Sequence, residues 1–140
     1  MKYNWNWGIL WQTSIDGQNT WIMMLIHGLG WTLFAALCAG VIALLLGSVI
    51  GVVRTTDHKW LVRLGNAYVE LFRNIPLLVQ LFLWFFVIPE LLPKAFGSAI
   101  KQMPPPWGSF VPAVIGLGLF TAARVAEQVR AGIESLPRGQ

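Results

Sequence analysis

The chain consists of long apolar runs that are separated by short polar segments. The first run, from Trp31 to Val53, contains no charged residue. At 1.5 Å per residue it would form a helix of roughly 34 Å, which is enough to cross a hydrocarbon layer of about 30 Å. We therefore predict a transmembrane helix at about residues 22–53.

A second apolar segment, at about residues 65–90, is interrupted by charged residues and a proline. Pro76 lacks a backbone N–H and disfavours helical geometry at Ile75, so we expect the helix to break there. The freed backbone groups would then line a polar cavity, with Arg73 and Asn74 at the break. A simple proline kink that is buried against a neighbouring helix is the alternative.

A third apolar run predicts a span at about residues 110–130. The segment before it, residues 94–109, contains three consecutive prolines, and we expect an external loop without a helix. Residues 1–20 mix tryptophans with polar residues, which is typical of the membrane interface. The whole pattern predicts an all-α membrane protein with three transmembrane helices.

The composition agrees with this prediction. Hydrophobic residues make up 56% of the 140 residues and charged residues only 11%, whereas a soluble domain carries about 25% charge. The net charge of +4 is spread between the apolar runs, so we expect membrane lipid rather than nucleic acid as a partner. Basic residues mark the cytoplasmic side, which predicts an N-terminus outside and a cytoplasmic loop at residues 54–63. The residues that set this orientation are Arg54, Lys59, Arg63, Arg130 and Arg138 inside, against Lys2, Lys94 and Lys101 outside.

Sequence signatures of enzymes and metal sites are absent. The chain has neither the Gly-rich phosphate-binding loop with its Lys nor the H-E-x-x-H and G-x-S-x-G motifs. The single cysteine, Cys38, lies in an apolar run and is interpreted as a packing residue. The N-terminus carries no cleavage site of a signal peptide. We expect no catalytic activity, no cofactor and no metal.

Small residues recur four apart in the first run. Gly47 and Gly51 form one such pair, and Ala36 and Gly40 form another. Pairs of this kind let membrane helices approach closely, so we predict that they pack against other helices.

Charged residues within the apolar runs are informative, because a lone charge in lipid costs at least about 2.5 kcal/mol on insertion scales. Glu70 shares a helix face with Arg73, and Glu127 shares one with both Arg124 and Arg130. One interpretation is a set of intrahelical ion pairs, which we favour for Glu70. The other is a polar translocation path that is completed by helices of partner subunits.

Two segments resemble permease subunits of bacterial ABC importers for polar amino acids. YVELFRNIPLLVQLFLWF, at residues 68–85, is similar to the motif of their second span. AEQVRAGIESLPRGQ, at residues 126–140, is similar to the segment that leads into their cytoplasmic coupling loop. The resemblance covers the whole chain, and TAARVAEQVRA, at residues 121–131, is most similar to the glutamate/aspartate permeases. It implies a type I importer fold, for which the family has five spans and an N-terminus outside.

The resemblance also implies a bacterial inner-membrane complex. Its other members would be a second permease subunit, cytoplasmic ATPase subunits that hydrolyse ATP, and a periplasmic amino-acid-binding protein. In the family, the coupling loop and two further spans follow the point where this sequence stops, so we expect it to correspond to the N-terminal part of a permease. The expected ATPase-coupling region comprises Gly132, Pro137, Arg138, Gly139 and Gln140.

Arg124 is the most informative of the charged residues. It is expected about 20 Å below an external boundary near Val111, within the membrane. Related permeases for other amino acids commonly carry an aromatic residue there, which implies that the guanidinium holds a substrate carboxylate through two parallel hydrogen bonds. The alternative is a structural clasp with Glu127 or Gln128. The predicted residues of the substrate site or translocation path are Arg124, Arg73, Asn74 and Glu127.

The main alternative to a permease subunit is a small three-span membrane protein with a structural or assembly role. An ion-channel subunit is less well supported, because the chain contains no filter sequence such as T-V-G-Y-G. Glutamate, aspartate and glutamine all remain candidate substrates.

Overall fold

The computed structural model describes residues 3–137, which form two compact units. The first unit ends at Phe34, and the second begins at Ala35. Within the described residues, all regular elements are helical, apart from an isolated antiparallel bridge between Thr13 and Thr20. The prediction of an all-α protein is confirmed.

The first unit contains a tight polar turn around Asp16. Its carboxylate accepts hydrogen bonds from the backbone N–H groups of Asn19 and Gln18, both at 3.0 Å, and from the hydroxyl of Ser14 at 2.5 Å. Gly17 takes a φ of 69°, which glycine tolerates. Because these donors stabilise the charged form, with the Asn19 backbone N–H as the largest influence, the pKa of Asp16 lies well below its usual range.

Exposed aromatic side chains precede this turn. The indole rings of Trp5 and Trp7 are stacked at 5.5 Å between centroids, and Trp7 begins the short 3-10 helix η1 (Trp7–Trp11). Trp11 is also exposed. The placement of residues 1–20 at the membrane interface remains a prediction.

In the part of the chain that the structure describes, two helices are long and apolar enough to cross a membrane, namely α1 (Trp21–Val53) and α6 (Trp107–Glu134). They agree with the first and third predicted spans. The second predicted span corresponds to α2 (Lys59–Asn74) and the helical stretch Leu77–Leu91, which are bent by 100° relative to each other. By length and composition, residues 3–137 thus contain two candidate spans, or three if this bent pair crosses as one broken span.

Glycines allow α1 and α6 to approach closely in the second unit. A Cβ atom on Gly47 would lie 2.7 Å from the carbonyl oxygen of Ala122, and one on Gly51 would lie 2.7 Å from Cβ of Val129. The predicted packing role of this pair is confirmed. Gly40 has no atom within 4 Å of its Cβ position, so the second predicted pair makes no such approach within the described residues. The buried small residues of this interface region are Ala39, Ala43, Ala122, Ala123 and Ala126.

The helix α2 begins at Lys59, so the prediction of a loop over residues 54–63 is wrong for its last five residues. The reason is that α2 is amphipathic. Val69 is buried against Ala123 and Ala126, whereas Lys59 on the same helix is exposed. An amphipathic helix buries only one face, so its first turns do not stand out as an apolar run.

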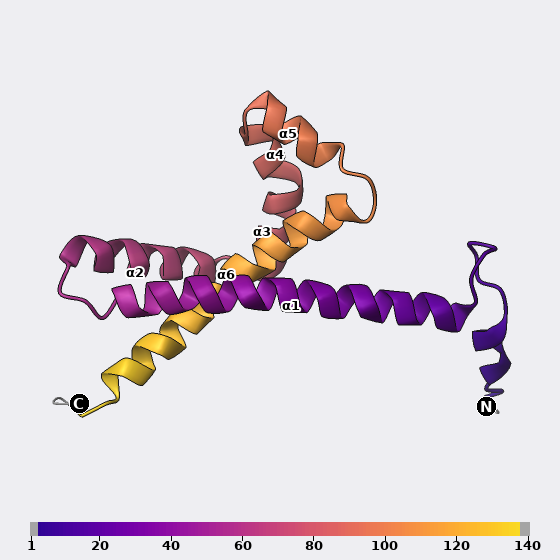
Figure 1. The fold of residues 1–140 in the computed structure, drawn as a ribbon, viewed down its shortest axis with the longest axis horizontal. Coiled ribbons are helices and arrows are strands. Elements are labelled where there is room, and N and C mark those ends of the chain that lie inside the picture. The colour runs from indigo at the N-terminus through magenta and orange to yellow at the C-terminus, as the bar shows by residue number, and fades with distance from the viewer. Residues whose placement is uncertain (1–2, 138–140) are drawn as a thin grey trace. The chain divides into compact units, whose positions relative to one another are not determined.

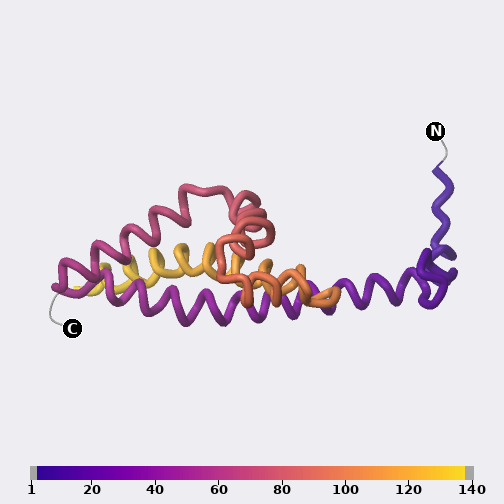
Figure 2. Tube along the Cα trace, turned by 90° about the horizontal axis from the view of Figure 1, so that it is seen from above, coloured from indigo at the N-terminus to yellow at the C-terminus, as the bar shows by residue number. Residues whose placement is uncertain are grey.

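The predicted break at Pro76 is confirmed. Ile75 is extended, with φ −91° and ψ 124°, and the chain resumes as α3 (Leu77–Phe82), the π-helical turn η2 (Leu83–Val87) and α4 (Ile88–Leu91). In the second unit, α6 packs against α2 and α3 (Figures 1 and 2).

A short helix, α5 (Lys94–Lys101), occupies part of the segment that was expected to form a loop without a helix. That prediction is wrong because Pro93 precedes the helix as its N-cap and the three prolines at residues 104–106 follow it. Proline restricts helices at and before its own position, and α5 ends at Lys101. α5 packs against α4 (Figure 1).

Candidate functional site

Glu127 on α6 is the centre of an ion-pair cluster that joins three segments of the second unit. Its Oε1 atom lies 2.7 Å from Nη1 of Arg54, which follows the end of α1. Its Oε2 atom lies 3.6 Å from Nη1 of Arg73, in the last turn of α2. One carboxylate thus contacts two guanidinium groups that lie far from it in the sequence.

Arg54 is held in place by its surroundings. Its Nε atom donates a hydrogen bond of 2.8 Å to Oδ1 of Asn66, and only 6% of its side chain is exposed. A Cβ atom on Gly65 would lie 2.6 Å from Cγ of Arg54, so the glycine makes room for the stem of the arginine. Nη1 forms no aligned hydrogen bond with any described residue, so its contact with Glu127 is a close charge pair rather than a hydrogen bond.

Arg124 does not form the structural clasp that was the alternative to substrate contact. Its guanidinium carbon lies 4.8 Å from the ring centroid of Phe120, one helical turn earlier, and the residue is exposed. Among the described residues, Arg124 has no ion pair with Glu127 and no hydrogen bond to Gln128. The planar guanidinium stacks on the ring face, which leaves its edge with the N–H donors free.

The other predicted intrahelical pairs also differ from the structure. Arg130 pairs with Glu134, at 2.8 Å, rather than with Glu127. Arg73 pairs with Glu127, and Glu70 forms no ion pair within residues 3–137. Helical spacing places residues on one face, but it does not decide which of the available partners lies closest.

Arg73, Arg124, Glu127 and Gln128 together line a cavity of about 480 Å³. Three of the four residues predicted for the substrate site therefore meet at one place. The fourth, Asn74, is exposed at the end of α2 and does not line the cavity. The lining carries two positive charges and one negative charge.

Gln80 was missed in the sequence analysis, although it shapes the bend. Its Nε2 atom donates to the carbonyl oxygens of Phe72 and Ile75, both at 2.8 Å, and only 3% of the residue is exposed. Two carbonyls at the break therefore bond to this amide instead of opening onto the polar cavity. The isolated Gln in the run LLVQLF, four residues after Pro76, was the available signal.

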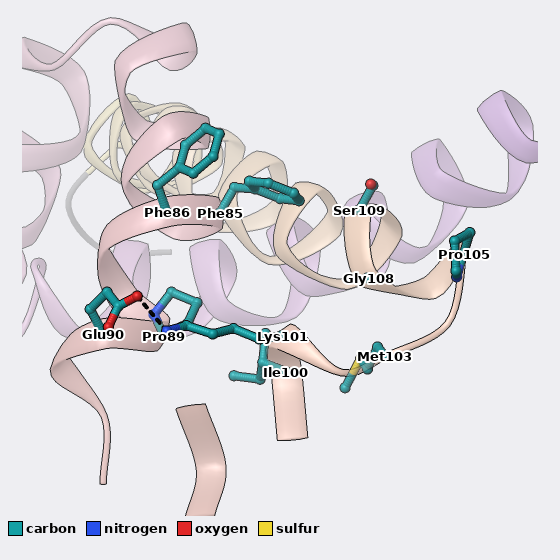
Figure 3. Close-up of a pocket in the computed structure, with 10 residues that line it drawn as sticks. All are labelled: Phe85, Phe86, Pro89, Glu90, Ile100, Lys101, Met103, Pro105, Gly108 and Ser109. Carbon is teal, nitrogen blue, oxygen red and sulfur yellow. Dashed lines mark hydrogen bonds and ion pairs between the residues drawn. The ribbon is translucent and has the colours of Figure 1, made fainter. Parts of the chain in front are cut away.

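A second cavity, of about 420 Å³, lies between η2, α4, α5 and the start of α6 (Figure 3). Phe85 and Phe86 border it, and Glu90 and Lys101 form an ion pair at its edge (Figure 3). A Cβ atom on Gly97 would overlap the carbonyl oxygen of Pro89, so α4 and α5 are in close backbone contact. None of the predicted site residues that the structure describes lines this cavity.

The predicted ATPase-coupling region lies at the end of α6. Gly132 belongs to the last turn and is exposed, and the hydroxyl of Ser135 donates to its carbonyl oxygen at 2.7 Å. Pro137 is exposed beyond the helix. Arg138, Gly139 and Gln140 lie outside the described residues.

Comparisons with known proteins give relatives along the whole chain. The chain is 49% identical over 141 aligned positions to the glutamate/aspartate import permease protein GltJ of Escherichia coli (strain K12), covering 100% of the chain and 57% of that protein. It is 36% identical over 117 positions to the probable glutamine ABC transporter permease protein GlnM of Bacillus subtilis, covering 84% and 49%. It is 35% identical over 117 positions to the glutamate/aspartate import permease protein GltK of Escherichia coli O6:H1, covering 83% and 50%.

No family model matches the chain, and no solved structure matches it. The chain spans between 49% and 57% of the length of these three curated relatives. The apolar helices and these relatives make it part of a multi-pass membrane protein. The chain belongs to the permease proteins of amino-acid ABC transporters.

Proposed function

We propose that the chain forms part of the transmembrane permease subunit of an ABC importer that moves an acidic amino acid, glutamate or aspartate, across the bacterial inner membrane. The identity of 49% to GltJ supports this substrate class. The relatives also favour a permease over a small membrane protein with a structural or assembly role. ATP hydrolysis takes place on separate cytoplasmic subunits.

The observation that carries the proposal is the guanidinium of Arg124 in the cavity of about 480 Å³, which has no ion pair or hydrogen bond from its side chain to any of residues 3–137. Phe120 supports its face, and Glu127, the nearest acidic residue on the same helix, is paired with Arg54 and Arg73 instead. A guanidinium with free donors binds a carboxylate in a bidentate manner, and this contact is strong where water is partly excluded.

The other predicted residues have different proposed roles. Arg73 is more than half exposed and contacts Glu127 only at 3.6 Å, so it retains donors for a ligand in the same cavity. Glu127 forms part of the cavity wall and is paired with Arg54 and Arg73. Asn74, which lies outside the cavity lining, is assigned to the translocation path beside the bend.

A complete importer requires partners, which we propose from the family. GltJ and GltK are two permease proteins of one strain with the same described function, and both are similar to this chain. We therefore propose a second permease subunit, together with ATPase subunits and a periplasmic amino-acid-binding protein. The N-terminus faces the periplasm, and residues 132–140 approach the ATPase. Crosslinking from a Pro137→Cys variant to the ATPase tests this last placement, and failure with several linker lengths contradicts it.

Substitution of Arg124 in the assembled transporter tests the function. Arg124→Tyr removes the charge but keeps a large planar side chain, so we expect uptake of glutamate and aspartate to be abolished while the complex still assembles. The matched control is Arg130→Tyr, which removes an arginine on the same helix that pairs with Glu134 outside the cavity lining. Unchanged acidic amino-acid uptake by an assembled Arg124→Tyr complex contradicts the proposal.

A further inference from the structure

We infer that Arg54 determines the preference of the cavity for ligands with two carboxylates, although it does not line the cavity itself. It acts as a positioning residue, because it holds the carboxylate of Glu127 and so prevents Glu127 from neutralising Arg124. The inference rests on the proposed function and names the ligand class, an α-amino dicarboxylate, and the residue that sets the selectivity.

Arginine side chains inside and outside the cavity compete for the carboxylate of Glu127. Glu127 lies three residues after Arg124 on α6, a spacing at which opposite charges attract on a helix surface. In the structure the carboxylate instead faces Arg54, at 2.7 Å, and Arg124 stacks on Phe120. Because Arg73 also contacts the carboxylate, at 3.6 Å, three arginines compete for Glu127, and Arg54, outside the cavity, holds it most closely.

Arg54 binds the carboxylate of Glu127 more strongly than Arg124 would, for two reasons. Its side chain is buried and is fixed by Asn66 and by the space above Gly65, so few additional side-chain rotations are lost when it pairs. An ion pair with a buried partner is screened less by water than a pair with an exposed one. Arg124 is exposed and its rotations are restricted only by the ring of Phe120, so a pair with it would be weaker.

The position of Glu127 determines which charges of the cavity face a ligand. With Glu127 held most closely by Arg54, Arg73 keeps only a contact of 3.6 Å with it, and the guanidiniums of Arg73 and Arg124 line the same space of about 480 Å³. Two guanidiniums match two carboxylates, and each contact can be bidentate. A ligand with one carboxylate and one amide, such as glutamine, would satisfy only one of them fully. The arrangement therefore favours glutamate or aspartate over their amides.

The competing explanation is a purely structural role for Arg54, because its ion pair with Glu127 also links the end of α1 to α6. The two explanations differ in what they predict for selectivity. If the ion pair only stabilises the contact between α1 and α6, its loss lowers the amount of folded complex and affects all ligands alike. Release of Glu127 toward Arg124 lowers the affinity for glutamate more than the affinity for glutamine.

The test measures binding of radiolabelled glutamate and glutamine to the purified, assembled transporter. Arg54→Gln is expected to lower the affinity for glutamate relative to glutamine by about tenfold, the size of one lost hydrogen bond to a charged group. Arg54→Lys keeps a positive charge near Glu127 and should recover part of the preference. The double variant Arg54→Gln with Glu127→Gln removes the competing carboxylate and should restore it.

An unchanged ratio of glutamate to glutamine affinity in Arg54→Gln overturns the inference, and so does a double variant that is no more selective than Arg54→Gln. If Arg54→Gln does not assemble, Arg54→Lys decides the question, because a smaller fall in the ratio of glutamate to glutamine affinity is expected for it and an unchanged ratio overturns the inference. An assembled wild-type transporter that binds neither glutamate nor aspartate overturns the proposed function as well. The two failures are thus distinguishable.

Discussion

Nη1 of Arg54 lies 2.7 Å from Oε1 of Glu127, and this contact joins the end of α1 to the C-terminal part of α6. It occurs one turn beyond Gly51, where the two helices approach so closely that a Cβ atom would overlap Val129. Small residues thus allow α1 and α6 to pack closely. The ion pair between Arg54 and Glu127 stabilises the polar end of the same interface. The position of Glu127, and with it the composition of the cavity, depends on this packing.

The first prediction concerns the glycine contact between α1 and α6. Gly47→Ala places a Cβ atom 2.7 Å from the carbonyl oxygen of Ala122, which belongs to the helix backbone and cannot rotate away. We expect a loss of stability of about 1–3 kcal/mol, measured as a lower melting temperature of the purified protein. Gly40→Ala is the matched control, because no atom lies within 4 Å of its Cβ position. Equal melting temperatures of the two variants would refute this account of the interface.

The second prediction concerns the bend between α2 and α3. Gln80→Leu has a similar volume but removes the amide that donates to the carbonyls of Phe72 and Ile75. A carbonyl group that is shielded from water and has no hydrogen-bond donor destabilises the folded protein. We therefore expect Gln80→Leu to lower the free energy of unfolding by about 1–3 kcal/mol. Gln102→Leu, at an exposed position after α5, should leave the melting temperature nearly unchanged. A Gln80→Leu protein as stable as this control would show that the bend does not need the amide.

These two contacts illustrate what the sequence could and could not predict. The uncharged run before Val53 predicts α1 almost to the residue, and the pair Gly47 and Gly51 predicts a packing face, because both signals are local. The partner of Glu127 was not predicted. Arg54 precedes it by more than 70 positions, and no local rule places them together. The same holds for the helix α2, whose buried face is defined only by the helices against which it packs.

The third prediction concerns the turn at Asp16. Hydrogen bonds to its carboxylate hold the pKa of Asp16 below its usual value, so the folded turn keeps the group ionised at pH values where an unfolded chain would protonate it. The stabilisation is present above the unfolded pKa and is lost as the pH falls through the folded pKa. Titration of the carboxyl carbon by NMR should show a midpoint below the usual value of about 3.9. Ser14→Ala removes one donor and should raise the midpoint, and an ordinary midpoint in the unaltered protein would contradict the geometry.

The fourth prediction concerns orientation in the membrane. A cysteine at Lys59, at the start of α2, should be labelled by a membrane-impermeant thiol reagent only after the membrane is opened, because this end is expected in the cytoplasm. Cys38 is replaced by alanine in this experiment so that it does not react. A cysteine at Gln102, after α5, is expected outside and serves as the control that is labelled in intact cells. Labelling at Lys59 from outside would reverse the proposed topology.

The last prediction concerns Phe120, which supports Arg124 and has no polar group of its own to offer a substrate. Its ring lies 4.8 Å from the guanidinium carbon, a distance at which a cation and an aromatic face attract each other by about 0.5–1 kcal/mol at an exposed site. Phe120→Leu keeps the apolar bulk but removes the aromatic face, so Arg124 should sample more conformations and the affinity for glutamate should fall about two- to fivefold.

Phe120→Tyr keeps the aromatic face and should retain the affinity, which makes it the matched control for side-chain volume and helix position. Because the proposed contact involves a carboxylate of the ligand, the loss in Phe120→Leu should be larger for glutamate than for glutamine. In an assembled transporter, a loss of the same size for both amino acids would indicate that Phe120 supports the fold alone. The stacking would then have no part in presenting Arg124 to the cavity.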